Sequence, residues 1–499
     1  MQKKELKEIL NAALSAGADF AEIFIEQKES TVISCEDSKI EKINTGIDYG
    51  MGIRVIAGES TSYVHSNDVS LNNGMQMAKL AGTVAQEHRS KATVQEFQMP
   101  GASQQPTVVQ RPEQVAFDDK IALLKVADAE ARALNETIQQ VSVSYSDVTQ
   151  KVLIANSDGT CVEDERVRVR FACNSIARRA DQIQTGFSSM GGTCGFELFE
   201  EKSAAQLGRE SAERAMTLLE AVPCPTGKMT VIIGSEAGGT MVHEACGHGL
   251  EGDLVQKGLS AYAGKLGQQV ASEKITVVDD ATIAGKYGSY AYDDEGNPGQ
   301  KTVLIENGVL VQYMNDLQTA RRTGAACTGN GRRESYREKP LTRMSNTYIA
   351  PGNDSVEDMI ASVEYGLYVK RMGGGQVNSL NGDYVFDVAE GYLIEHGQIT
   401  KAVRGATLAG NGPESLRNVE MVGNDLGYAI GTCGKNGQSA PVADAQPTLK
   451  IHGLTVGGTG AANEKTHRAK RLCSVMGFVF VVGDHAVGKF VVVKYIGSV

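Results

Sequence analysis

The segment MTVIIGSEAGGTMVHEACGHGLEGD, residues 229–253, contains a short apolar run, a glycine-rich turn and a stretch with two histidines. The apolar run MTVII is typical of a buried strand, and the residues after the turn have the character of a helix. A strand that leads directly into a helix places side chains rigidly. The segment therefore predicts a strand–turn–helix unit that holds His243 and His248 in defined positions.

The spacing of the two histidines constrains the local backbone. His243 and His248 are five residues apart, and Glu244 directly follows the first histidine. An ideal α-helix turns by about 100° per residue, so five steps leave two side chains about 140° apart. Gly247 and Gly249 flank His248, and glycine tolerates the dihedral angles of a distorted turn. We therefore expect a π-type bulge or a local unwinding that swings His248 back toward His243.

Two histidines beside a glutamate indicate a metal site of the zinc peptidase type. Such a zinc ion polarises the scissile carbonyl and lowers the pKa of its bound water, and a neighbouring carboxylate takes the proton of that water. Glu244 is the candidate for this general base. Because catalytic zinc usually has three protein ligands, one ligand remains to be found. From the residues alone, four candidates for it stay open: Glu251, Asp253, Cys246 and Cys433.

The composition is that of a globular protein of 499 residues, with 41% hydrophobic and 22% charged residues. No apolar run of about 18 residues occurs, and the N-terminus lacks a secretory apolar region, so we expect a cytoplasmic protein without a membrane span. The net charge of −11 disfavours direct binding of nucleic acid. The nine cysteines lie far apart, which favours reduced thiols over a disulfide framework.

Periodicity predicts two small α/β units before this segment. The first covers residues 1–98, with a helix at 2–16, alternating strands and a second helix. A linker rich in proline and glutamine covers residues 99–116. The second unit, residues 117–222, repeats the plan and begins with a helix at 117–136.

The strand VRVRF in the second unit alternates apolar residues with Arg168 and Arg170. We expect these arginines to face solvent or a partner, and a solvated face is the favoured interpretation. Residues 223–499 form a glycine-rich, mainly antiparallel β domain that carries the short metal-binding helix. Its predicted strands include the apolar runs at 474–498. The predicted fold class is therefore α+β, with two N-terminal α/β units before a large β-rich domain.

Several stretches resemble the TldD/PmbA family of cytoplasmic metallopeptidases, and its catalytic TldD branch in particular. They include HEACGHGLEGD at 243–253, GIRVIAGESTSYVHSND at 52–68, GGGQVNSLNGDYVF at 373–386 and GTCGKNGQSAPVADAQ at 431–446. The resemblance covers most of the chain and is strongest after residue 229. The PmbA-like branch lacks the metal ligands that this sequence keeps.

The resemblance implies one zinc ion per chain, bound by His243, His248 and Cys433, with Glu244 as the general base. It implies a zinc-dependent metallopeptidase that hydrolyses peptide bonds in unfolded peptides or peptide precursors, with Glu244 activating a zinc-bound water. The active protein is expected to be a dimer, either a homodimer or a heterodimer with a PmbA-like non-catalytic paralogue.

Two other functions stay open at this point. One is a non-catalytic or structural-metal partner protein of a peptidase or regulatory complex, in line with the family's historical label as a modulator of gyrase. The other is a thiol peptidase that uses Cys246. For the metallopeptidase, a substrate would add as a strand to a sheet edge near the zinc. The glycines at 373–375 would permit that close approach or would form a bulge.

Overall fold

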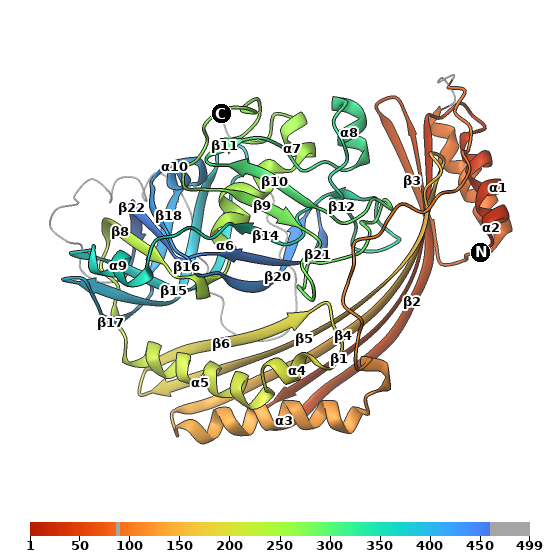
Figure 1. The fold of residues 1–499 in the computed structure, drawn as a ribbon. Helices are drawn as coiled ribbons and strands as arrows, with labels where there is room; N and C mark the ends of the chain where they lie inside the picture. The colour runs from red at the N-terminus through yellow and green to blue at the C-terminus, as the bar shows by residue number, and fades with distance from the viewer. Residues whose placement is uncertain (86–89, 460–499) are drawn as a thin grey trace, which may run out of the picture.

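The computed structural model describes residues 1–85 and 90–459 of the protein (Figure 1). The strands predicted at 474–498 lie outside these ranges. Within them, no helix combines the length and the apolar character that crossing a lipid bilayer requires.

The N-terminal part forms one long, curved, six-stranded antiparallel sheet with the order β3-β2-β1-β4-β5-β6. Its strands are β1 Phe20–Glu36, β2 Lys39–Ala57, β3 Ser60–Ser66, β4 Ile138–Asn156, β5 Cys161–Arg179 and β6 Gln182–Gly192. Strands β1 and β4 pair from Glu22 to Glu36 of β1. The two α/β segments predicted from the sequence therefore contribute to a single continuous sheet.

Four longer helices cover the convex face of this sheet, namely α1 Lys3–Leu14, α2 Leu71–Gly82, α3 Phe117–Leu134 and α5 Ala204–Glu220, and the short helix α4 Leu198–Glu201 packs beside α3 and α5 (Figure 1). Ile23 of β1 packs in the apolar cluster of α1 and α2, and Ile33 packs in the cluster of α3 and α5. Both are odd-numbered positions, so both helix pairs lie on the same face of the strand. The helices predicted at 2–16 and 117–136 are thus confirmed as α1 and α3.

The concave face of the sheet contacts the C-terminal part of the chain. Phe24 of β1 packs against Tyr292 and Tyr336, which belong to loops of the C-terminal part. Arg168 of β5 is only 7% exposed, and its guanidinium donates to the backbone oxygens of Tyr287 and Ser289. The solvated face expected for Arg168 is therefore wrong, because this face of the strand meets another part of the protein instead of water.

The C-terminal part contains two further large sheets, ordered β11-β10-β9-β14-β21-β20 and β15-β8-β22-β18-β16-β17-β7. Their neighbours are mainly antiparallel, with parallel pairs β14–β21, β15–β8 and β17–β7. The strands of the first are β9 Val277–Asp280, β10 Lys301–Glu306, β11 Val309–Leu310, β14 Thr347–Ile349, β20 Gly427–Lys435 and β21 Gln438–Gln446. Those of the second are β7 Val222–Pro223, β8 Gly227–Ile233, β15 Tyr365–Val377, β16 Asp383–Glu395, β17 Gln398–Arg404, β18 Thr407–Asn411 and β22 Leu449–Gly457.

The predicted α+β class is confirmed, but the C-terminal part has more helix than expected. Besides the helical turns that carry the two histidines, its described residues form four short helices: α7 Gly252–Gln256, α8 Leu317–Thr323, α9 Val356–Ala361 and α10 Gly412–Arg417. The helical segment itself lies inside the largest apolar cluster. There Met241 and Val242 pack with Ile233 of β8 and Ile451 of β22. This packing fixes the helical segment between the two sheets.

Candidate metal centre

The segment after β8 contains the predicted distortion of the helix. Helix α6, Thr240–Val242, continues into a π-helical turn at His243–Gly247 and then a 3-10 turn at His248–Leu250. The N–H of His248 donates to the carbonyl of His243, which is the i→i+5 hydrogen bond of a π-turn. The two imidazole rings lie 4.9 Å apart, centre to centre. The expected π-type bulge is confirmed, and it brings both histidines to one side of the helix.

Gly247 serves this turn through its small size and not through unusual dihedral angles. Its φ of −52° and ψ of −58° are ordinary helical values. A Cβ atom on Gly247 would lie 2.2 Å from Sδ of the fully buried Met344. The reason first given for this glycine, freedom of its dihedral angles, is therefore wrong. The turn needs a residue without a side chain because Met344 packs directly against it.

Cys433 joins the two histidines from a distant strand. It lies on β20, and its Sγ is 3.4 Å from Nε2 of His248. The ligand atoms of His243, His248 and Cys433 all lie within 4.8 Å of one another. A tetrahedral zinc ion with bonds of about 2.0 Å to nitrogen and 2.3 Å to sulfur separates such atoms by about 3.5 Å. The three side chains therefore bring two imidazole nitrogens and a thiol sulfur close enough together to form a candidate site for a metal ion.

The charges in this cluster favour a thiolate. Burial alone would raise the pKa of Cys433, but hydrogen bonds and the charges of His243 and His248 lower it to about 5. Burial alone would likewise lower the pKa of His248, but Glu251 and Cys433 raise it to about 9. The site thus stabilises a negatively charged sulfur beside two imidazoles, and the thiolate is the form of cysteine that binds metal ions.

The other three candidates for the third ligand lie elsewhere. Cys246 is fully buried, and its thiol donates to the carbonyl of Val242. Burial raises the pKa of Cys246 to about 12, so this thiol is inert and a thiol peptidase based on it does not fit the structure. Asp253 pairs with Lys435 at 2.6 Å. Glu251 faces His248, but it contacts the ring nitrogen on the side away from Cys433.

A carboxylate holds each histidine from behind. Nδ1 of His243 lies 3.0 Å from Oδ1 of Asp444, and Nδ1 of His248 lies 3.1 Å from Oε2 of Glu251. A carboxylate oxygen accepts, so each imidazole donates its Nδ1–H, and Nε2 is the nitrogen that can bind a metal ion once it has lost its proton. The sequence analysis missed this role of both acids. The spacing of Glu251 three residues after His248 was a usable signal, whereas Asp444 is 201 residues from His243 and gave none.

Glu244 lines one pocket together with His243, His248 and Cys433, and this pocket has a volume of about 780 Å³. Its walls include Thr432 and Gly434 of β20 and Gly374 and Gly375 of β15. Burial raises the pKa of Glu244, while the neighbouring histidines oppose that rise. The structure therefore places the predicted base and the three predicted ligands around one cavity.

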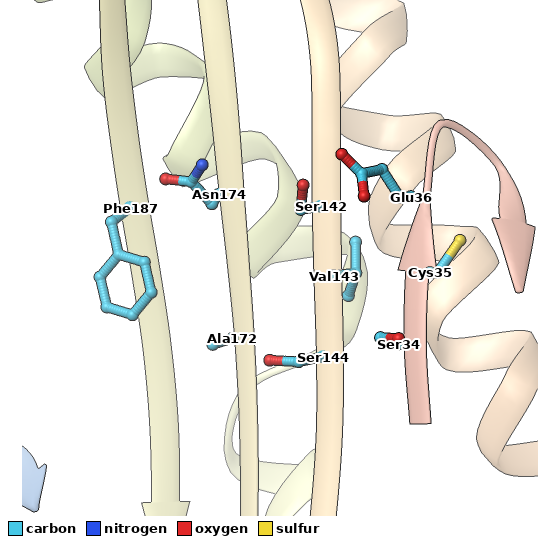
Figure 2. Close-up of a pocket in the computed structure, with 9 residues that line it drawn as sticks. All are labelled: Ser34, Cys35, Glu36, Ser142, Val143, Ser144, Ala172, Asn174 and Phe187. Atoms are coloured by element: carbon cyan, nitrogen blue, oxygen red, sulfur yellow. The ribbon is translucent and has the colours of Figure 1, made fainter. Parts of the chain in front are cut away.

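A second cavity of about 200 Å³ lies on the N-terminal sheet (Figure 2). Its polar groups include the hydroxyls of three serines, the amide of Asn174 and the carboxylate of Glu36, with the ring of Phe187 at one side. This cavity lacks the histidines and the thiolate of the larger pocket. The pocket beside Cys433 is therefore the candidate functional site.

The chain is similar to known proteins over most of its length. Three domain descriptions of one family match the chain: PmbA/TldA metallopeptidase domain 1 at residues 21–86, the central domain at 110–219 and the C-terminal domain at 226–458. The Metalloprotease TldD homolog of Haemophilus influenzae is 40% identical over 451 residues, which cover 88% of this chain and 93% of that protein. The chain belongs to the TldD/PmbA family of metallopeptidases.

Other relatives and solved structures show how far this family likeness extends. A metalloprotease of Methanocaldococcus jannaschii is 39% identical over 437 residues, which cover 85% of this chain and 94% of the relative. The crystal structure of TldE from Thermococcus kodakarensis has a TM-score of 0.73 at 19% identity and covers 91% of this chain and all of that one. At this identity the TldE structure shows the shared fold alone. The resemblance inferred from the sequence is confirmed.

Proposed function

We propose that the protein is a zinc-dependent metallopeptidase that hydrolyses peptide bonds in unfolded peptides or peptide precursors. The observation that supports this proposal most strongly is the meeting of His243, His248 and Cys433 at one point, with Glu244 on the same pocket. Two imidazole nitrogens and a thiolate form a donor set that suits zinc. Three protein ligands are typical of catalytic zinc sites, whereas structural sites usually have four.

Each residue of the proposed site has a separate role. A bound zinc ion would supply the positive charge that polarises the scissile carbonyl and acidifies a water molecule. Glu244 accepts the proton of the attacking water and delivers it to the leaving nitrogen. Because burial raises the pKa of Glu244, its carboxylate is a stronger base than an exposed one. Asp444 and Glu251 keep the imidazoles of His243 and His248 in the orientation that aims Nε2 at the site.

Two strand edges beside the pocket support an extended substrate. Strand β20 is the last strand of its sheet, and within the described residues it pairs with β21 alone. Strand β15 pairs with β8 only from Gly366 to Val369, so its later residues, which reach the pocket, have no strand on that side among the described residues. Backbone groups at such edges can bind an added peptide strand of any sequence.

The glycines at these edges leave room for a peptide backbone. A Cβ atom on Gly374 of β15 or on Gly434 of β20 would have no neighbour within 4 Å. Strand β15 also has shifts in register between Met372 and Gly375, so the bulge considered for the glycines at 373–375 is present. A folded domain does not offer such an extended strand, and we therefore propose an unfolded chain as the substrate.

We also propose that the active form is a dimer, either of two copies or with a PmbA-like non-catalytic paralogue. Val32 and Phe187 leave 41% and 50% of their surface exposed on the part of the concave sheet face that this chain does not cover. We propose that a partner bound to this face, which also carries polar side chains such as Ser142 and Asn174, encloses the pocket. Measurement of the native mass after co-purification tests the proposal, and a fully active monomer would refute it.

The substitution Glu244→Gln tests the catalytic proposal. It keeps the size of the side chain and all three ligands, so the protein should retain zinc while peptide hydrolysis falls at least about 100-fold, as expected for the loss of a general base. Glu273→Gln, at an exposed position of the same domain, is the matched control and should retain full activity. Hydrolysis by Glu244→Gln at the wild-type rate would contradict the mechanism. Zinc binding by a wild type that cleaves no peptide would favour the structural-metal alternative.

A further inference from the structure

Lys435 connects the two elements that carry the proposed metal ligands. It follows Cys433 by two residues on β20, so both side chains lie on the same face of the strand. Its ammonium lies 2.9 Å from Oε2 of Glu251 and 2.6 Å from Oδ1 of Asp253, and it donates to the carbonyl of Thr342. Lys435 is 9% exposed and Glu251 is fully buried. The strand and the histidine segment are therefore joined by a buried ion pair.

The same carboxylate oxygen of Glu251 contacts both Lys435 and His248. It lies 2.9 Å from Nζ of Lys435 and 3.1 Å from Nδ1 of His248. A buried carboxylate is costly unless a cation compensates its charge. Lys435 supplies that cation, and Glu251 can then accept the Nδ1–H of His248. The opposite nitrogen, Nε2, is thereby directed toward Cys433, whose Sγ lies 3.4 Å away.

The other histidine is held differently. The imidazole of His243 contacts the carboxylate of Asp444. Among the ion pairs of the described residues, Asp444 has no lysine or arginine partner. The two ligands therefore have separate supports, one neutralised by a lysine and one not. A change at Lys435 should reach the site through His248 and leave the support of His243 in place.

We propose that Lys435 is a positioning residue of the metal site. Through Glu251 it fixes the tautomer and the orientation of His248, and its place on β20 ties that orientation to the position of Cys433. This inference rests on the proposed metal site. Loss of a residue that orients a metal ligand typically weakens metal affinity 10–100-fold.

The variant Lys435→Met tests this role, because it removes the charge and keeps an unbranched side chain. Affinity for Co²⁺ and Zn²⁺ is measured by competition with a chelator, and the thiolate-to-Co²⁺ absorption band reports whether Cys433 still binds. We expect roughly 10–100-fold weaker affinity. Lys274→Met removes a lysine that is 49% exposed and pairs with Asp354, and it should leave the affinity unchanged.

Two double variants separate positioning from a general effect on stability. If Lys435 acts through Glu251, Lys435→Met combined with Glu251→Gln should bind metal no more weakly than the weaker single variant. Combined with Asp444→Asn, the losses should multiply, because Asp444 supports the other histidine. A merely structural role for Lys435 would give multiplied losses in both combinations, and that result would overturn the inference.

The outcomes also distinguish this inference from the proposed function. A wild type that binds neither metal would remove the metal site itself. A wild type that binds metal, with Lys435→Met binding it equally well, would overturn only the role of Lys435. If Lys435→Met does not fold, Glu251→Gln alone provides the test, since the same 10–100-fold loss is expected from it. An unchanged affinity of that variant would again overturn the inference.

Discussion

The helical segment at 240–253 and the hairpin of β20 and β21 supply the two halves of the site, and they are built in different ways. The helical segment is tightly packed, because the side chain of Met344 leaves no room for a Cβ atom on Gly247. A single π-turn places its two histidines. The hairpin is open at the pocket, since Gly434 next to Cys433 has free space beside it. It contributes Cys433, Lys435 and Asp444 from strand positions far along the chain.

This difference separates the ligand positions that follow from spacing in the sequence from those that depend on the tertiary fold. The relation between His243 and His248 depends on five consecutive backbone units, so it follows from one π-turn. The relation of Cys433 to the histidines depends on the packing of a sheet against the helical segment. Substitutions in the two regions should therefore differ in their effects on metal binding and on stability.

The largest effect on metal binding is expected from His243→Ala. Zinc affinities of about 10–16 kcal/mol shared among four ligands give roughly 2.5–4 kcal/mol per ligand, or about 70-fold to 900-fold in affinity. Peptide hydrolysis should disappear together with the metal. Elemental analysis should find close to one zinc ion per wild-type chain and little in the variant. Full zinc content in His243→Ala would show that the helical segment is not half of the site.

A smaller but selective effect is expected from the hairpin. Cys433→Ser replaces the thiolate with a poorer ligand, and we expect zinc retention to fall by roughly tenfold to several hundred-fold. Cys246→Ser is the matched change in the helical segment, and its zinc affinity should stay near that of wild type because this thiol faces the apolar core. Chelator competition on both variants checks the difference. Equal losses would mean that the wrong thiol was assigned to the site.

The smallest effects are expected from substitutions of two glycines, and they concern the free energy of unfolding. Gly247→Ala forces a methyl group against Met344, and such overpacking should lower the free energy of unfolding by about 1–3 kcal/mol. The methyl group added by Gly434→Ala would have no atom within 4 Å, so the free energy of unfolding should change by less than about 0.5 kcal/mol. Denaturant unfolding of the metal-free proteins measures both values. Similar losses in the two variants would remove the contrast between a packed segment and an open hairpin.

Part of the fold could be predicted from periodicity alone. Helices α1 and α3 show apolar residues at helical spacing, and the VRVRF stretch alternates as a strand must. The environment of Arg168 could not be predicted, because alternation shows that two faces differ but does not show what covers each face. The short helices α8, α9 and α10 were also missed. Segments of six or seven residues carry too few turns for a clear period.

The sequence by itself determined the local part of the site. The five-residue spacing of His243 and His248 excludes a regular α-helix as the frame for one metal ion, and the adjacent Glu244 indicates a base; both conclusions need only the geometry of a short backbone segment. The tertiary structure alone decided which groups surround that segment. Asp444 reaches His243 across 201 residues, and Lys435 of β20 reaches Glu251 of the helical segment. Their contacts exist because the packing of sheets buries these charges together, and burial is a property of the whole fold.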